Sequence, residues 1–233
     1  NDQVQIISDG SAATGIIQGS ILSIEKSYKV TIDVVSITGS IKILLGGVAG
    51  EIVVTDTGVQ TFYEVGAGTA LYIYRVVGEA VDVVINSISV QELGEGWTLG
   101  TGWSIGEDKA ISTLQSGSKY LTQSPIIESG KSYKATFEVI DYTSGSVKAT
   151  VSGDEGEART GIGTYTETLN STGTNFSIKN QSGLFIGSVS NVSVKEIATS
   201  YLTQAVSLSA KTWKIIYSVS DYIAGSVSAT DYG

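Results

Sequence analysis

Apolar and polar residues alternate along several short stretches of the chain, and the alternation returns at corresponding places. Residues 131–139 read KSYKATFEV, residues 26–34 read KSYKVTIDV, and residues 211–219 read KTWKIIYSV. A period of two is typical of a strand that covers a core with one face. Sustained helical spacing is absent, so the pattern predicts an antiparallel β-sandwich or barrel.

The alternation also predicts which side chains lie in the core. We expect the following residues to point inward: Tyr28, Val30, Ile32 and Val34; Tyr133, Ala135, Phe137 and Val139; Trp213, Ile215, Tyr217 and Val219. A turn follows each of these strands, and glycine stands at the same place in each turn, as Gly39, Gly145 and Gly225. Glycine at this point of a hairpin indicates a positive φ.

The chain contains an internal duplication. At an offset of 105 residues, Gly68 falls on Gly173 and Ile73 falls on Ile178. The first copy closes with SISVQEL at 87–93, and the second closes with NVSVKEI at 191–197. Repeated matches in one register indicate that one module was copied along the polypeptide.

A third, partial copy is indicated by a short motif. YLTQ occurs at 120–123 and 201–204 and corresponds to GIIQ at 15–18, which aligns Gln18, Gln123 and Gln204. A repeated glutamine could line a binding cleft, or it could satisfy backbone groups at a sheet edge. Recurrence in every copy favours the second interpretation, because what all copies share usually serves the fold.

These boundaries predict three modules, at residues 1–94, 95–197 and 198–233. The second is complete and opens with GWTLGTGWSIGEDKA, a segment without a counterpart in the first; the third has only two core strands. We therefore expect an all-β chain of tandem antiparallel β-sandwich modules, jelly-roll-like and incomplete at both ends. Either the array is longer or neighbouring chains supply the missing strands, because a half-sandwich leaves strand edges unpaired.

The amino-acid composition argues against several classes of function. The formal net charge is −9, from 23 acidic and 14 basic residues, with no cluster of cations. This argues against nucleic acid as a partner, and the absence of an apolar run of about 20 residues argues against membrane insertion. Cysteine and histidine are both absent, which removes thiolate chemistry and the commonest general base. We expect no catalytic residues and no enzymatic activity.

The second copy resembles the carbohydrate-binding-module-like jelly rolls of phage tail and virion proteins and of secreted glycoside hydrolases. The resemblance lies in the opening GWTLGTGWSI, the YLTQ strand, the KSYKATFEVIDYTSGSV hairpin and the closing SVSNVSVKEI. It implies a jelly-roll fold that binds glycans or assembles. Calcium-bearing members commonly carry an acidic residue before the closing strand, where this chain has Asn86 and Asn191. That difference argues against a calcium site of the family type.

Aromatic residues of the second copy are the candidates for glycan binding. Trp97 and Trp103 could stack on a sugar ring, or they could be core residues of the opening strand. Tyr142 follows Asp141 at a hairpin tip, where it could contact a ligand or a neighbouring chain. The alternative for Tyr142 is an ordinary turn with a packed ring.

A compact acidic loop is the candidate metal site. Asp154, Glu155 and Glu157 lie close together in the sequence, and calcium prefers oxygen ligands. One short loop cannot supply the six to eight oxygens that calcium takes, so a solvated acidic loop is the alternative. No other cofactor is indicated.

The function expected from these observations is structural. The chain reads as a non-enzymatic virion protein, such as a tail fibre, appendage or capsid-decorating protein of a phage. Its partners would be copies of itself or other virion proteins, with contacts to host glycans as a further expectation. The alternatives are a glycan-binding accessory module of a secreted enzyme and a bacterial surface adhesin or filament subunit, which would place the chain outside the cell or on its surface.

Overall fold

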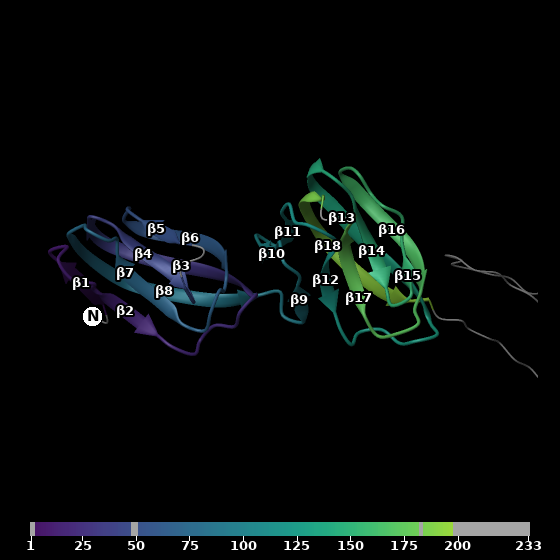
Figure 1. Ribbon diagram of the computed structural model, residues 1–233, viewed down its shortest axis with the longest axis horizontal. Helices are drawn as coiled ribbons and strands as arrows, with labels where there is room; N and C mark the ends of the chain where they lie inside the picture. The colour runs from purple at the N-terminus through teal and green to yellow at the C-terminus, as the bar shows by residue number, and fades with distance from the viewer. Residues whose placement is uncertain (1–2, 48–50, 182–183, 198–233) are drawn as a thin grey trace, which may run out of the picture. The chain divides into compact units, whose positions relative to one another are not determined.

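The computed structural model describes residues 3–47, 51–181 and 184–197, and these residues form β-strands joined by turns (Figure 1). They contain two hydrophobic cores, one built from residues before position 94 and one from residues after it. Within these ranges, no helix has the length and apolar character needed to cross a membrane.

The first core lies between two four-stranded antiparallel sheets. One sheet has the order β1-β8-β3-β6, with bounds Val4–Ser8, Val81–Leu93, Ser27–Thr38 and Gly58–Val65. The other has the order β2-β7-β4-β5, with bounds Gly15–Gln18, Leu71–Arg75, Ile41–Leu45 and Ile52–Val54. This is a β-sandwich.

The second core lies between two five-stranded antiparallel sheets. One has the order β10-β11-β18-β13-β16, with bounds Trp103–Gly106, Lys109–Ser112, Ile186–Glu196, Ser132–Ser144 and Gly163–Asn170. The other has the order β15-β14-β17-β12-β9, with bounds Asp154–Glu155, Val147–Val151, Phe176–Asn180, Lys119–Gln123 and Trp97–Leu99.

The two sandwiches correspond strand for strand. The order β1-β8-β3-β6 matches β11-β18-β13-β16, and β2-β7-β4-β5 matches β12-β17-β14-β15. The second sandwich has two additional strands, β9 and β10, which pair with β12 and β11. The predicted all-β, jelly-roll-like sandwich architecture is confirmed for the described residues.

The inward faces are those that the alternation predicted. On β3 and β13, all eight side chains expected to be inward are at most 4% exposed: Tyr28, Val30, Ile32, Val34, Tyr133, Ala135, Phe137 and Val139. The third-copy residues Gln204, Trp213, Ile215, Tyr217, Val219 and Gly225 lie outside the described residues.

The two buried tyrosines have equivalent surroundings. The Tyr28 hydroxyl accepts a hydrogen bond from the backbone N–H of Ser23 at 2.6 Å, and the Tyr133 hydroxyl accepts one from Glu128 N–H at 2.7 Å. In both cases the donor lies five residues before the tyrosine. A buried tyrosine needs a partner for its polar end, and both copies supply it in the same way.

The hairpin glycines adopt the predicted conformation. Gly39 has a φ of 79° and Gly145 a φ of 76°. A Cβ at Gly39 would lie 2.2 Å from the carbonyl oxygen of Ala80, and one at Gly145 would lie 2.1 Å from that of Leu184. Glycine is therefore required both by the backbone conformation and by a neighbouring loop segment that leaves no room for a side chain.

Replacing Gly145 by alanine should destabilise the second sandwich by about 3 kcal/mol, because left-handed strain adds to displacement of the neighbouring backbone. Gly117→Ala is the matched control: its φ is 71°, but a Cβ there would meet nothing within 4 Å. The control should lose about 1 kcal/mol from strain alone. Denaturant unfolding measures both, and equal losses would show that the close contact contributes nothing.

Candidate functional site

The opening segment of the second sandwich is the feature that most distinguishes the two copies. Strand β9 pairs with β12 through Leu99↔Leu121, and β10 pairs with β11 through Trp103↔Ser112. Because β12 and β11 belong to different sheets, one short segment bridges the two sheets and closes one side of the sandwich. Glycines 100 and 102 form the bend between its two strands.

Trp103 is a core residue. Its side chain is 3% exposed, and its ring centroid lies 6.4 Å from that of Phe185. Its indole Nε1 is buried without a hydrogen-bond partner among the described residues. A ring enclosed to this extent offers no free face to a sugar, so its position matches the core alternative of the sequence analysis.

Trp97 is half-buried and packs edge-on against Phe176, with the ring centroids 6.4 Å apart and an interplanar angle of 61°. It shares no aromatic partner with Trp103. Of the two tryptophans in the opening segment, Trp97 is the one that keeps part of its surface accessible. A stacking role therefore stays a prediction for Trp97.

Tyr142 lies in strand β13, two residues before the strand ends at Ser144, and its ring is packed. Its hydroxyl donates a hydrogen bond to the carbonyl oxygen of Gly145 at 3.0 Å, and its ring centroid lies 6.4 Å from that of Phe185. The structure thus brings Tyr142 and Trp103 onto the same phenylalanine, while Trp97 contacts a different one. The three aromatic candidates do not form a single flat platform.

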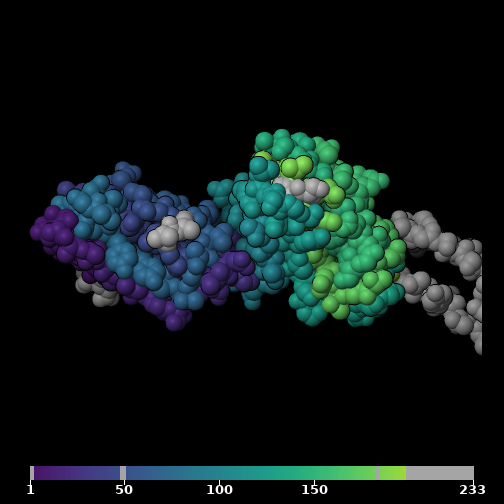
Figure 2. Space-filling view, viewed as in Figure 1, coloured from purple at the N-terminus to yellow at the C-terminus, as the bar shows by residue number. Residues whose placement is uncertain are grey.

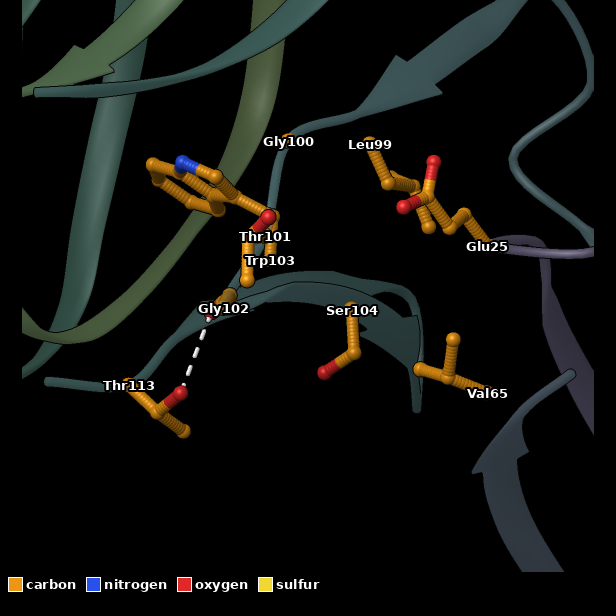
Figure 3. A pocket seen from close by; sticks show the side chains of 9 residues that line it. All are labelled: Glu25, Val65, Leu99, Gly100, Thr101, Gly102, Trp103, Ser104 and Thr113. Atoms are coloured by element: carbon orange, nitrogen blue, oxygen red, sulfur yellow. Dashed lines mark hydrogen bonds between the residues drawn. The ribbon is translucent and has the colours of Figure 1, made fainter. Parts of the chain in front are cut away.

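A hollow of about 360 Å³ borders the opening segment (Figure 3). It is lined by Glu25, Val65, Leu99, Gly100, Thr101, Gly102, Trp103, Ser104 and Thr113. The indole of Trp103 points away from Glu25 and Val65, so the ring does not project across the hollow (Figure 3). The Thr113 hydroxyl donates to the carbonyl oxygen of Gly102 at 3.3 Å. The polar side chains of the lining are one carboxylate and three hydroxyls, a set suited to hydrogen bonding.

Residues of the first copy also hold the opening segment. Ile105 N–H donates to the hydroxyl oxygen of Ser27 at 2.7 Å, and the Lys26 ammonium donates to the carbonyl oxygen of Trp97 at 2.9 Å. Sequence reasoning missed both residues as contacts. Their recurrence as Lys131 and Ser132 was a signal, because the KS pair begins the central strand in both copies.

The acidic loop is held by protein donors. Asp154 accepts hydrogen bonds from the backbone N–H groups of Glu155 and Asn170, each at 2.9 Å. Glu157 forms an ion pair with Arg159 at 3.1 Å. A carboxylate that anchors a turn or neutralises a cation has less to offer an ion. No group of three or more acidic side chains within the described ranges is placed to hold a metal.

Within this loop, Glu155 is the residue that forms ion pairs with two lysines. Its carboxylate lies between the ammonium groups of Lys148, at 2.5 Å, and Lys179, at 2.6 Å. These lysines, Lys148 first, lower the pKa of Glu155 below its usual value. The calcium role that the sequence suggested for Asp154, Glu155 and Glu157 stays a prediction, and any ion there would compete with the lysines.

No protein-family model matches the chain, and no curated protein matches it. Function is therefore inferred from the repeated sandwich, the opening segment and the residue pattern of positions 96–105.

Trp103→Ala should destabilise the second sandwich by about 4 kcal/mol, because it empties a large volume in the core. Trp97→Ala should lose about half as much, since its ring is already partly exposed. Denaturant unfolding followed by circular dichroism measures both losses. Equal losses would contradict the placement of Trp103 in the core and of Trp97 at its margin.

The folded-state pKa of Glu155 is lowered, so its ion pairs should stabilise the fold above the usual glutamate pKa and lose this effect as pH falls through the lowered value. Glu155→Gln should therefore flatten the fall in unfolding free energy below about pH 5. Urea unfolding between about pH 2 and pH 6 measures this. Glu157→Gln, at a side chain that is 78% exposed, is the control and should keep the wild-type slope. Identical slopes in all three proteins would contradict the role of the lysine pair.

Proposed function

We propose that this chain is a non-enzymatic structural protein of a virion, such as a tail fibre, appendage or capsid-decorating protein of a phage. Tandem sandwiches would provide its length and surface. Its partners would be further copies of itself or other virion proteins. The proposal combines the repeated architecture with the resemblance of positions 96–105, and of the closing strand, to modules of such proteins.

The observation that carries the proposal is what the two copies share. Strand order, the tyrosine–backbone hydrogen bond and the hairpin glycines all recur, and each of them serves the scaffold. The features that could bind a ligand, namely Trp97, Tyr142 and the acidic loop, belong to the second copy alone among the two described sandwiches. Duplication has therefore multiplied the scaffold and not a site.

The charged groups also support a structural role. Several side chains with shifted pKa values form ion pairs at the surface, for example Lys109 with Asp141 at 3.4 Å, where the aspartate raises the pKa of the lysine. Arg159 pairs with Glu167 in the same way, and its pKa is raised. Catalytic acids and bases are typically set in clefts that exclude water, with pKa values tuned toward neutrality. The pairs described here stabilise charge instead.

Contact with a glycan, if it occurs, would involve Trp97, because its ring is partly accessible and aromatic faces suit the apolar side of a sugar. This contact would accompany the structural role and not replace it. In a glycan-binding module of a secreted enzyme, by contrast, sugar binding would be the main activity.

The test is to locate the chain in its source. Antibodies raised against residues 96–197 should label purified virions along a tail, appendage or capsid in electron micrographs, and mass spectrometry of the same particles should recover peptides of the chain. Labelling of a cell envelope or of a secreted enzyme in place of particles would contradict the proposal. Glycan-array binding that Trp97→Ala abolishes, together with unlabelled virions, would support the accessory-module alternative.

A further inference from the structure

Strands β1 and β2 lie at sheet edges of the first sandwich, whereas their counterparts in the second sandwich do not. Strands β1 and β2 each have one described neighbour, β8 and β7. Their counterparts β11 and β12 each have two, because β10 and β9 of the opening segment pair with their outer sides. In the first sandwich, the outer edges of β1 and β2 have no partner strand among the described residues (Figure 1).

At one pair of equivalent positions, the additional strand changes how far a side chain is buried. Ile16 pairs with Ile73 as Leu121 pairs with Ile178, so the two side chains occupy the same point of the fold. Leu121 is 1% exposed because Leu99 of β9 lies opposite it, whereas Ile16 is 39% exposed. The first sandwich therefore leaves a core position open that the second one covers.

The open side of the first sandwich is also apolar. Exposed aliphatic residues gather on β1, on β2 and in the turn after β2: Val4, Ile7, Ile16, Ile17, Ile21 and Ile24, which are 39–62% exposed. Strands β1 and β2, purple in Figure 2, read VQIIS and GIIQ and contain no charged residue. Edge strands are usually protected by lysine, proline or a bulge, and β1 and β2 contain neither lysine nor proline.

We propose that β1 and β2 form an acceptor site for an extended peptide with the chemistry of Glu95–Gly106. The occupant has two short strands, each with a tryptophan and an aliphatic residue separated by one hydroxyl residue, and a glycine-rich bend joins them. One of its strands adds to β2 and the other to β1, so that the peptide bridges the two sheets. The second sandwich identifies this occupant, because the same fold takes such a segment at the same two edges.

The pairing geometry allows the segment to be supplied in cis. In the second sandwich, β10 continues into β11 through Glu107 and Asp108, which have φ values of 52° and 58°, as in a two-residue hairpin turn. In sequence, Asn1 and Asp2 correspond to these residues, since Val4 pairs with Ile85 as Ala110 pairs with Val189. A copy of Glu95–Gly106 joined to Asn1 is thus in register to complete the first sandwich.

The experiment compares chain 1–233 with a fusion that carries a second copy of residues 95–106 before Asn1. Hydrogen–deuterium exchange should slow at least about tenfold at residues 4–8 and 15–18 in the fusion, because these amides gain cover and partners. The control fusion has serine at the appended counterparts of Trp97, Leu99 and Trp103. It should exchange like the unfused chain.

A substitution in the acceptor tests the same site from the other side. Ile16→Ser should remove most of the slowing in the fusion, because Ile16 meets the appended leucine. Ile17→Ser is the matched control: it lies on the same strand, and its counterpart Thr122 points to the other face. That control should retain the slowing. Absence of slowing in the fusion, equal slowing in the serine control fusion, or slowing insensitive to Ile16→Ser would each overturn the proposal.

Discussion

The pairing of the central strand with the closing strand holds each sandwich in register. Strand β3 pairs with β8, and β13 with β18, over nearly their whole lengths. Both ladders contain an irregularity at the corresponding point, next to Asp33 in the first and Glu138 in the second. A side-chain amide bonds to each of these carboxylates: Asn86 to Asp33 at 2.8 Å and Asn191 to Glu138 at 2.6 Å. A slip by one residue would turn the buried faces of β3 and β13 outward, so this pairing determines the core.

The alternation along the chain was sufficient to predict the fold class and the inward faces. Tyr133 and Phe137, like Tyr28 and Ile32, lie in the core because a strand with apolar residues on one face has only one side to bury. The glycine conformations were also predictable, since local geometry sets them. The boundaries near residues 94 and 197, by contrast, remain predictions from sequence.

The candidate site was less predictable because its environment comes from distant segments. Periodicity could not show whether Trp103 would lie against Phe185, which is 82 positions further along the chain (185 − 103). Nor did the acidic loop reveal that Lys148 and Lys179, from strands β14 and β17, would flank Glu155. Residue type indicates what a side chain can do, and the long-range pairing of strands decides which neighbours it meets.

The similarity of the two central strands has a consequence for biosynthesis. KSYKVT and KSYKAT are nearly the same sequence, so each could pair with the closing strand of the other copy in an exchange between modules. Strand β8 ends at Leu93, before the second KSYK begins at residue 131. The first core can therefore close on the ribosome before its competitor has been translated. Translation in this order thus lets the first copy fold before the second is complete, which disfavours the exchange of strands between the two copies.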